Sequence, residues 1–221
     1  MIARGELSRD KHFAMVHYKL TYFPLRGAAE HIRQIFAAAG QEFEDVRIPR
    51  EEWPHLHKDK CPFGQLPVLE VDGQQLPQSY AISRFLAREF NLAGQNEWEE
   101  ALVDSLADQF KDLKEEVRPY FIVSVGFGEG DLEQLKKDVL LPAVNKSFAF
   151  FTNFIRNNRS GFLVGDHLTW VDILLAENVA NLATKAPEIL DSFPEIVAHL
   201  DKIHSIPSIK HWRETRPKTP F

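Results

Sequence analysis

Tyr22 stands at the end of a predicted strand, where a turn passes the chain to a predicted helix. Residues 16–22 read as the strand and Phe-Pro-Leu-Arg-Gly, residues 23–27, as the turn. Backbone N–H groups and the positive end of a helix dipole favour anions at such a junction. A phenol there can donate a hydrogen bond to a thiolate or another anion. The position alone fits equally well a tyrosine that is half-buried at a strand end.

Two further segments stand where predicted elements begin. Gln78 and Ser79 lead into an apolar-faced helix, and Ser79 is the expected N-cap of that helix. Gln65 and Leu66 precede Pro67, which opens a strand. A cis bond before Pro67 would point backbone groups outward.

Other reactive residues favour ordinary roles. Cys61 is the only cysteine and belongs to no C-x-x-C motif, so a free loop thiol is favoured over a redox nucleophile. His55 and His57 lack further metal ligands in the local sequence and fit a solvated loop. The glycines at 126–130 follow a helix and lack the Lys-Ser/Thr ending of a phosphate loop. No metal is expected.

Composition sets the class of protein. The 221 residues are 44% hydrophobic and 26% charged, with a net charge of −6, which disfavours nucleic-acid and anionic-membrane partners. No apolar run approaches the roughly 20 residues of a membrane span. The single cysteine fits a reducing compartment, so a cytoplasmic location is expected. Residues 1–14 are polar and are interpreted as a flexible leader or tag.

The elements that hold these residues predict two domains. Residues 15–93 should form a small mixed sheet with helices, in the order β-α-β, an irregular loop, β-β and α. The expected strands and first helix cover 16–22, 26–39, 43–48, 67–71 and 74–76, with 49–66 irregular. Asp72-Gly73 marks a hairpin between the last two strands.

Residues 97–221 should be all-helical. Apolar residues at near-heptad spacing predict a helix from about 97 to 125. Thr169 and Asp172 form a predicted capping box that opens an almost wholly apolar central helix. Further helices are expected over 131–157, 194–204 and 207–213.

Three motifs carry a resemblance to a known family: KLTYF at 19–23, PFGQLPVL at 62–69 and LVGDHLTWVD at 163–172. Along 15–221 the chain resembles the cytosolic glutathione transferases. The tyrosine context and Glu52-Trp53-Pro54 look most like the sigma class of the haematopoietic prostaglandin D synthases, particularly its nematode nu-class branch, which includes haem-binding hookworm enzymes. The resemblance implies an α/β thioredoxin-like domain with a mixed four-stranded sheet, an all-α domain, a homodimer, and glutathione as co-substrate.

The resemblance also implies a role for each matching position. Tyr22 would be the catalytic residue and donate a hydrogen bond to the glutathione sulfur. The cysteinyl part would pair with the backbone like an added strand, the γ-glutamyl carboxylate would lie at a helix N-terminus, and Trp53 would help hold the glycyl end. The implied glutathione-binding set is Tyr22, Trp53, Lys58, Gln65, Leu66, Pro67, Gln78, Ser79 and, from the partner subunit, Asp112.

Several positions stay open. The loop after Trp53 is about one residue longer than in the family, so the glycyl cation could be His57, Lys58 or Lys60, with Lys58 favoured. Ala28 stands where sigma-class enzymes commonly carry an arginine that assists the thiolate.

The implied electrophile pocket is lined by Phe23, Leu25 and residues near Tyr120, with Tyr120 included. Phe63 either packs into a partner subunit or anchors its own loop.

The expected activity is conjugation of the glutathione thiolate to hydrophobic electrophiles in detoxification. Lowering a thiol pKa from about 8.5 to about 6.5 needs roughly 2.7 kcal/mol, and one hydrogen bond to a charged group supplies about 1.5–3 kcal/mol. The alternatives are a ligandin-type carrier of haem or other apolar ligands and a glutathione-dependent prostaglandin-H2 D-isomerase, which Ala28 mildly disfavours. A purely structural role would require a glutathione site that has lost its function.

Overall fold

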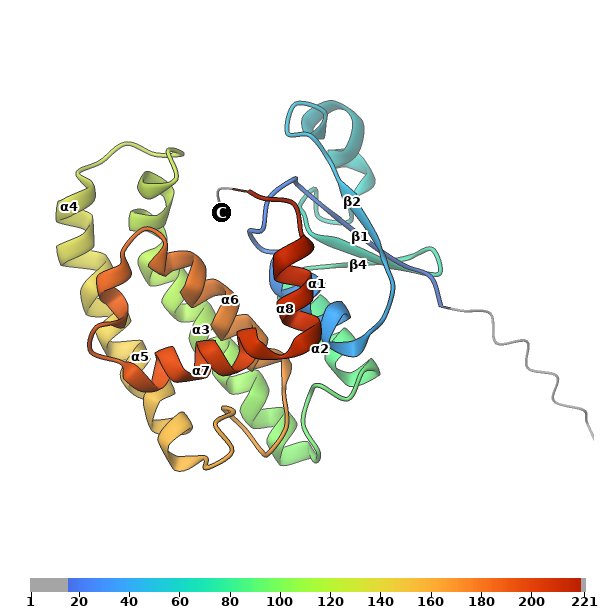
Figure 1. The fold of residues 1–221 in the computed structure, drawn as a ribbon. Helices are drawn as coiled ribbons and strands as arrows, with labels where there is room; N and C mark the ends of the chain where they lie inside the picture. Colours follow the sequence, from blue (N-terminus) through green and yellow to red (C-terminus); the bar gives the residue numbers. More distant parts are fainter. Residues whose placement is uncertain (1–15, 220–221) are drawn as a thin grey trace, which may run out of the picture.

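The N-terminal part of the chain folds around a four-stranded mixed sheet. In a computed structural model, which describes residues 16–219, the strands occur in the order β2-β1-β3-β4 (Figure 1). β1 is parallel to β2 and antiparallel to β3, which forms a hairpin with β4. The strands are β1 (Tyr18–Tyr22), β2 (Glu44–Arg47), β3 (Val68–Val71) and β4 (Gln74–Pro77). The expected leader lies outside the described residues.

Two helices pack on this sheet, and both begin differently from the prediction. α1 (Glu30–Ala39) starts at Glu30 rather than 26, because hydrogen bonds from Leu25 N–H to Phe23 O and from Ala29 N–H to Arg26 O fold the preceding residues into turns. It ends at Gly40 in the left-handed conformation, as predicted.

α2 (Ser79–Glu89) has Gln78, not Ser79, at its N-cap position, so the predicted cap was wrong by one residue. Gln78 makes no capping hydrogen bond through its side chain.

The segment predicted as irregular contains two short helical turns, Trp53–His57 and Lys58–Lys60. It leads to the Leu66-Pro67 peptide bond, which is cis as predicted.

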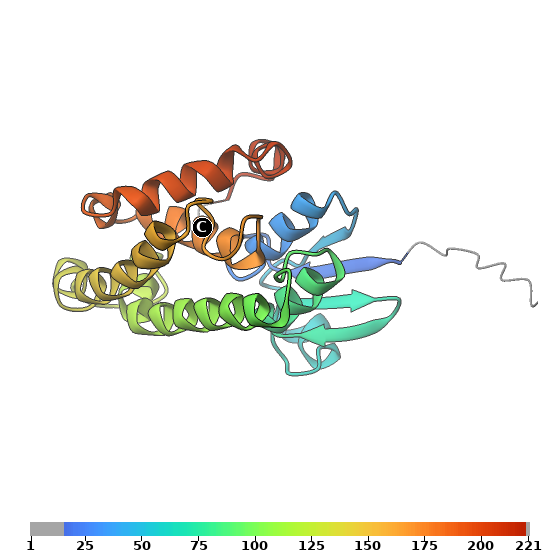
Figure 2. The same ribbon diagram turned by 90° about the horizontal axis from the view of Figure 1, so that it is seen from below.

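The rest of the described chain is helical. α3 runs from the edge of the sheet domain along the helical domain, as the green helix in Figure 2 shows. The predicted helix at 131–157 is found as α4 and α5 joined by a wider helical turn, Lys136–Leu140. The helices are α3 (Glu97–Ser124), α4 (Leu132–Leu135), α5 (Leu141–Asn157), α6 (Trp170–Ala183), α7 (Pro194–Ser205) and α8 (Pro207–Thr215), with a short 3-10 turn at Pro187–Leu190.

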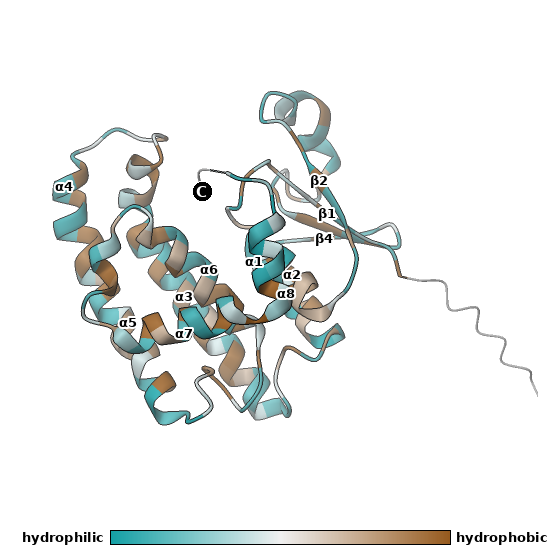
Figure 3. Cartoon of the chain, in the orientation of Figure 1, coloured by the Kyte–Doolittle hydropathy of each residue, from teal (hydrophilic) through white to brown (hydrophobic). Residues whose placement is uncertain are grey.

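α6 lies at the centre of the helical domain, and most of its residues are buried. The other helices carry hydrophilic residues beside hydrophobic ones, as expected of helices with one solvent-facing side (Figure 3). The predicted capping box is present: the Asp172 carboxylate accepts hydrogen bonds from the Thr169 N–H at 2.8 Å and hydroxyl at 2.7 Å. None of the helices between residues 16 and 219 combines the length and apolar character that a membrane span requires.

Buried charges join the two domains where α1 meets α6 and α8. The carboxylates of Glu30 on α1 and Glu177 on α6 both lie within 3.1 Å of Arg216, which follows α8. We call this group the interdomain charge cluster; it comprises Glu30, Glu177, Arg26, Arg33, Arg213 and Arg216. The Gln34 amide and the Trp212 indole also donate to its two carboxylates, at 2.7 and 2.8 Å.

Candidate functional site

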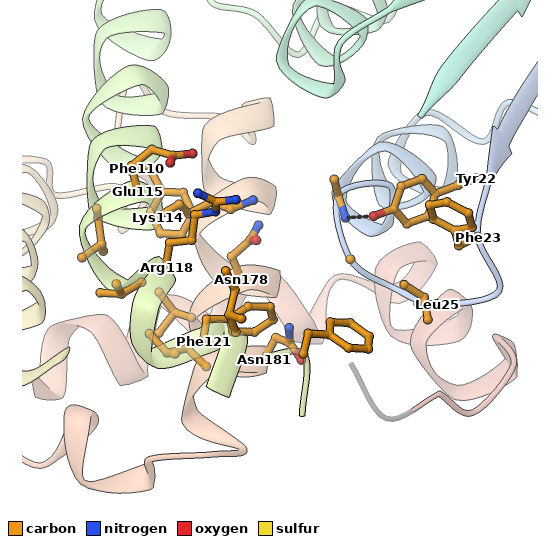
Figure 4. A pocket seen from close by; sticks show the side chains of 18 of the residues that line it. Tyr22, Phe23, Leu25, Phe110, Lys114, Glu115, Arg118, Phe121, Asn178 and Asn181 are labelled. Carbon is orange, nitrogen blue, oxygen red and sulfur yellow. Dashed lines mark hydrogen bonds between the residues drawn. The ribbon is translucent and has the colours of Figure 1, made fainter. Parts of the chain in front are cut away.

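Tyr22 ends β1 and is only 8% exposed. Its hydroxyl oxygen accepts a hydrogen bond from the Ala28 backbone N–H at 3.1 Å, drawn as a dashed line in Figure 4. Gly27 has a φ of 43°, and a Cβ added there would lie 2.6 Å from that hydroxyl, so glycine permits the close approach. Because the amide already donates to the oxygen, the hydroxyl proton is left to donate to a ligand.

The surroundings keep this phenol protonated. Burial raises the pKa of Tyr22 above the ordinary value of 10.0, and the Ala28 N–H and two nearby arginines oppose that shift only in part. At neutral pH the side chain is therefore a hydrogen-bond donor and not a phenolate.

Arg33, which the sequence analysis did not single out, fixes the turn after Tyr22. Its fully buried guanidinium donates to the carbonyl oxygen of Leu25 at 2.9 Å and to Asp45 on β2 at 3.0 Å. It also lies 6.0 Å from the centre of the Tyr22 ring. One side chain thus ties α1, β2 and the turn together. In the sequence, Arg33 is simply a polar residue within a predicted helix. Its role follows from its tertiary contacts with Leu25 and Asp45.

Gln65 and Gln78 come together at the start of α2, where the Gln78 side-chain amide donates to the Gln65 oxygen at 3.3 Å. Gln78 has a φ of 76°, a strained conformation of the kind that occurs at binding sites. The first N–H groups of α2 have no partner within the helix, and no side chain of the N-cap residue covers them. This helix end can accept an anion.

The predicted glycyl-binding residues lie on the two helical turns after β2. The Trp53 ring is 5.7 Å from the Phe23 ring, which itself lies 5.5 Å from Tyr22. Lys58 is exposed and runs past Gly64. His57 lies 3.6 Å from the carboxylate of Glu52. The ring contacts therefore connect Trp53 through Phe23 to Tyr22. They do not distinguish His57, Lys58 and Lys60 as the cation for the glycyl carboxylate.

A cavity of about 370 Å³ lies between the two domains and reaches Tyr22. Phe23 and Leu25, which the resemblance implies for the electrophile pocket, line this cavity, and α3 and α6 form the opposite wall (Figure 4). The lining residues are Tyr22, Phe23, Leu25, Gly27, Ala28, Arg50, Phe110, Leu113, Lys114, Glu115, Val117, Arg118, Phe121, Ile122, Phe127, Phe148, Asn178, Val179, Asn181 and Leu182.

Tyr120 does not line this cavity. It is fully buried, and its hydroxyl donates to the backbone oxygen of Lys185 at 3.3 Å. Phe121 and Ile122, the next residues on α3, line the cavity instead, because each helical step turns the side chain by about 100°.

Three cations that were not predicted from the sequence lie in the cavity wall: Arg50, Lys114 and Arg118. Lys114 and Arg118 are four residues apart on α3, so they share one helix face. Arg50 lies across from them and is 4.2 Å from the centre of the Phe127 ring. The spacing of Lys114 and Arg118 can be read from the sequence and indicates two cations on one helix face. The contact of Arg50 with Phe127 in the glycine-rich loop is seen only in the structure.

The remaining candidate residues, Cys61, Phe63 and Asp112, do not line the cavity. Cys61 is half-buried, and burial raises the pKa of its thiol, which disfavours a reactive thiolate. Between residues 16 and 219, no three His, Cys, Asp or Glu side chains come together as a candidate metal site. Asp112 and Phe63 are exposed, the latter by 62%.

A thioredoxin-like sheet domain, an all-helical domain and an apolar cavity beneath a strand-end tyrosine define the class of the glutathione transferases. Comparison with known families agrees: the glutathione S-transferase N-terminal domain family matches residues 18–88, and the C-terminal domain family matches residues 111–216. The chain belongs to the glutathione S-transferase family, and its activity is that of a glutathione S-transferase.

Similar proteins come from nematodes. A probable glutathione S-transferase 7 of Caenorhabditis elegans is 58% identical over 94% of this chain and 100% of its own length. A solved nu-class enzyme from Haemonchus contortus is 57% identical, covers 94% of this chain and all of its own, and has a TM-score of 0.87.

Two further structures bear on assembly and chemistry. A glutathione S-transferase of Necator americanus described as monomeric is 57% identical over 93% of this chain and 100% of its own, with a TM-score of 0.90. A prostaglandin synthase D of Nilaparvata lugens is 39% identical over 91% of this chain and 100% of its own, with a TM-score of 0.82.

Proposed function

We propose that Tyr22 stabilises the glutathione thiolate, which then attacks a hydrophobic electrophile in the interdomain cavity. The observation that carries this proposal is the Ala28 N–H bond to the Tyr22 oxygen, which leaves the phenol proton for the sulfur. One such hydrogen bond to a thiolate contributes about 1.5–3 kcal/mol. That range covers the preference needed to lower a thiol pKa by one to two units.

Glutathione would lie along the edge of the sheet domain. The γ-glutamyl carboxylate would sit at the uncapped start of α2 beside Gln78, Ser79 and Gln65, whose side chains and backbone lie close together. The backbone of Leu66, ahead of Pro67, would pair with the cysteinyl part.

The glycyl end would lie between Trp53 and Lys58. The ring contacts that link Trp53 through Phe23 to Tyr22 support this direction along the site. His57 and Lys60 are the alternatives to Lys58.

The working unit is proposed to be a homodimer of sigma-like, nu-class type in the cytoplasm. Phe63 exposes 62% of its surface, and Asp112 is exposed on α3. An aromatic side chain left so exposed suits an interface, where Asp112 of the partner subunit would reach the γ-glutamyl amine. Sedimentation of wild type and Phe63→Ser tests this proposal: a dimer that dissociates in the variant supports it, and a wild-type monomer contradicts it.

The catalytic proposal is tested by steady-state conjugation of glutathione to a neutral chloronitroaromatic electrophile. Tyr22→Phe removes one oxygen and should lower kcat by about 10- to 100-fold, with the KM for glutathione nearly unchanged.

Tyr18→Phe is the matched control, because Tyr18 lies four residues earlier on the same face of β1 and packs among phenylalanines. It should retain the wild-type kcat. Equal activity of wild type and Tyr22→Phe would show that another group activates the sulfur.

A second candidate activity is the glutathione-dependent isomerisation of prostaglandin H2. The similarity to the Nilaparvata lugens prostaglandin synthase D favours it, whereas Ala28 in place of the usual arginine weighs against it. Product analysis with that endoperoxide distinguishes the two activities.

A further inference from the structure

Lys114 differs from the other half-buried lysines of the described chain. Lys19 donates to Glu70 at 2.6 Å, Lys136 donates to Glu133 at 3.1 Å, and Lys202 donates to the backbone oxygen of Ser160. Within residues 16–219, the Lys114 amine has no hydrogen-bond acceptor and no carboxylate within ion-pair distance. A half-buried amine without a partner lacks the interactions that usually offset its lost hydration.

The surroundings of Lys114 point to a ligand rather than to a missing protein contact. Lys114 lines the cavity, on the α3 wall across from Tyr22 (Figure 4). Burial lowers the pKa of its amine, an effect that the neighbouring Glu115 opposes only in part. Arg118 stands one helical turn further on and Glu115 also lines this wall, whose other α3 residues are apolar: Phe110, Leu113, Val117, Phe121 and Ile122. The cavity therefore combines apolar walls with a cationic end that faces the reactive centre.

We propose that the preferred electrophile is an apolar molecule with a carboxylate at one end, which pairs with Lys114 while its electrophilic carbon faces the glutathione sulfur at Tyr22. This inference rests on the proposed transferase reaction and adds its substrate class. A long-chain acid with a conjugated aldehyde or ketone at its far end fits this arrangement. Its carboxylate would pair with Lys114, and its electrophilic carbon would lie near the sulfur at Tyr22. An amine with no protein acceptor gains a charge-assisted hydrogen bond when such a ligand binds.

The reaction with such an enal is a conjugate addition. The glutathione sulfur forms a bond to the β-carbon, and the π electrons of the C=C bond move through the α-carbon to the carbonyl oxygen as an enolate. Water then supplies a proton to the α-carbon, and the hydroxide formed balances the proton that the thiol released on ionisation. No redox partner is needed, and the carboxylate of the substrate is unchanged.

The test compares two probes that differ only in charge: an ω-carboxy dodecenal whose aldehyde is conjugated to the double bond, and the methyl ester of the same enal. Wild type should show the higher kcat/KM for the acid. Lys114→Met should lower kcat/KM for the acid by about 10- to 100-fold, the size of one charge-assisted hydrogen bond, and change the value for the ester by less than about threefold. Lys114→Arg should restore the preference for the acid.

Lys111→Met is the matched control, because Lys111 is exposed on the same helix and outside the cavity wall. It should leave both values unchanged. Equal loss for acid and ester in Lys114→Met, or no preference for the acid in wild type, would overturn the inference. If wild type conjugates the neutral aromatic electrophile but neither enal, the transferase proposal stands and this inference fails; inactivity toward all three probes would contradict the transferase proposal itself.

Discussion

The interdomain charge cluster and the cavity wall use the same kinds of side chain in opposite ways. In the cluster, Glu177 accepts from Gln34 at 2.7 Å and lies 3.1 Å from Arg216. In the cavity, Lys114 has no acceptor among residues 16–219, and Arg50 faces the Phe127 ring. Charges that find partners inside the protein hold the fold together, whereas cations left without carboxylates keep their binding capacity for a ligand. Breaking each region should therefore have a different consequence.

The largest effect is expected from Glu177→Gln in the interdomain charge cluster. The substitution leaves buried arginine charge without its carboxylate, and breaking a buried pair in this way costs about 3–5 kcal/mol of unfolding free energy. Urea unfolding measures the loss. Glu116→Gln is the control, since Glu116 pairs with Lys146 at the surface, where such pairs contribute about 0–1 kcal/mol. Similar losses in both variants would remove the distinction between the two regions.

A smaller effect concerns His31, which is fully buried on α1 and has no hydrogen bond on either ring nitrogen. Burial, with Lys114 and Arg33 nearby, lowers the pKa of His31 from 6.5 to about 3. The folded state keeps the ring neutral while the unfolded state binds a proton below pH 6.5, so stability is lost as the pH falls toward about 3.

His31→Phe should reduce the slope of stability against pH by about 1.4 kcal/mol per pH unit between about pH 6 and pH 4. Urea titrations at several pH values measure the slope. His55→Gln, at an exposed position, should leave it unchanged. An unaltered slope in His31→Phe would mean that His31 is protonated in the folded protein.

The smallest effect is expected from Lys114→Met when stability, not specificity, is measured. Removing a desolvated amine without a partner should leave the unfolding free energy unchanged or raise it by up to about 1 kcal/mol. Arg216→Met, the corresponding loss in the interdomain charge cluster, should lower it. A clear destabilisation by Lys114→Met would show that the cavity lysine serves the fold.

Much of the fold follows from local signals in the sequence. The Asp72-Gly73 hairpin, the stop at Gly40, the capping box of Thr169 and the long α3 are each specified by residues close in sequence, and the structure confirms them. The start of α1 was misplaced because hydrogen bonds within the turn, and not side-chain periodicity, decide where the helix begins.

The candidate site was only partly predictable. Family motifs pointed to Tyr22, and the apolar turn residues Phe23 and Leu25 do line the cavity. Tyr120, which the resemblance implied for the electrophile pocket, is buried outside this cavity, because a resemblance identifies a helix segment more easily than the face that a single residue occupies. Lys114 was missed because its lack of a partner is a property of the three-dimensional neighbourhood.

The central claim is that Tyr22, held by the Ala28 amide, ionises bound glutathione. The most direct test is the ultraviolet absorbance of the bound thiolate against pH, in wild type and in Tyr22→Phe. The account predicts a pKa of the bound thiol about one to two units below the free value of about 8.5 in wild type, and a value close to the free one in the variant. An equally lowered pKa in both proteins would contradict the account and assign the activation to another group.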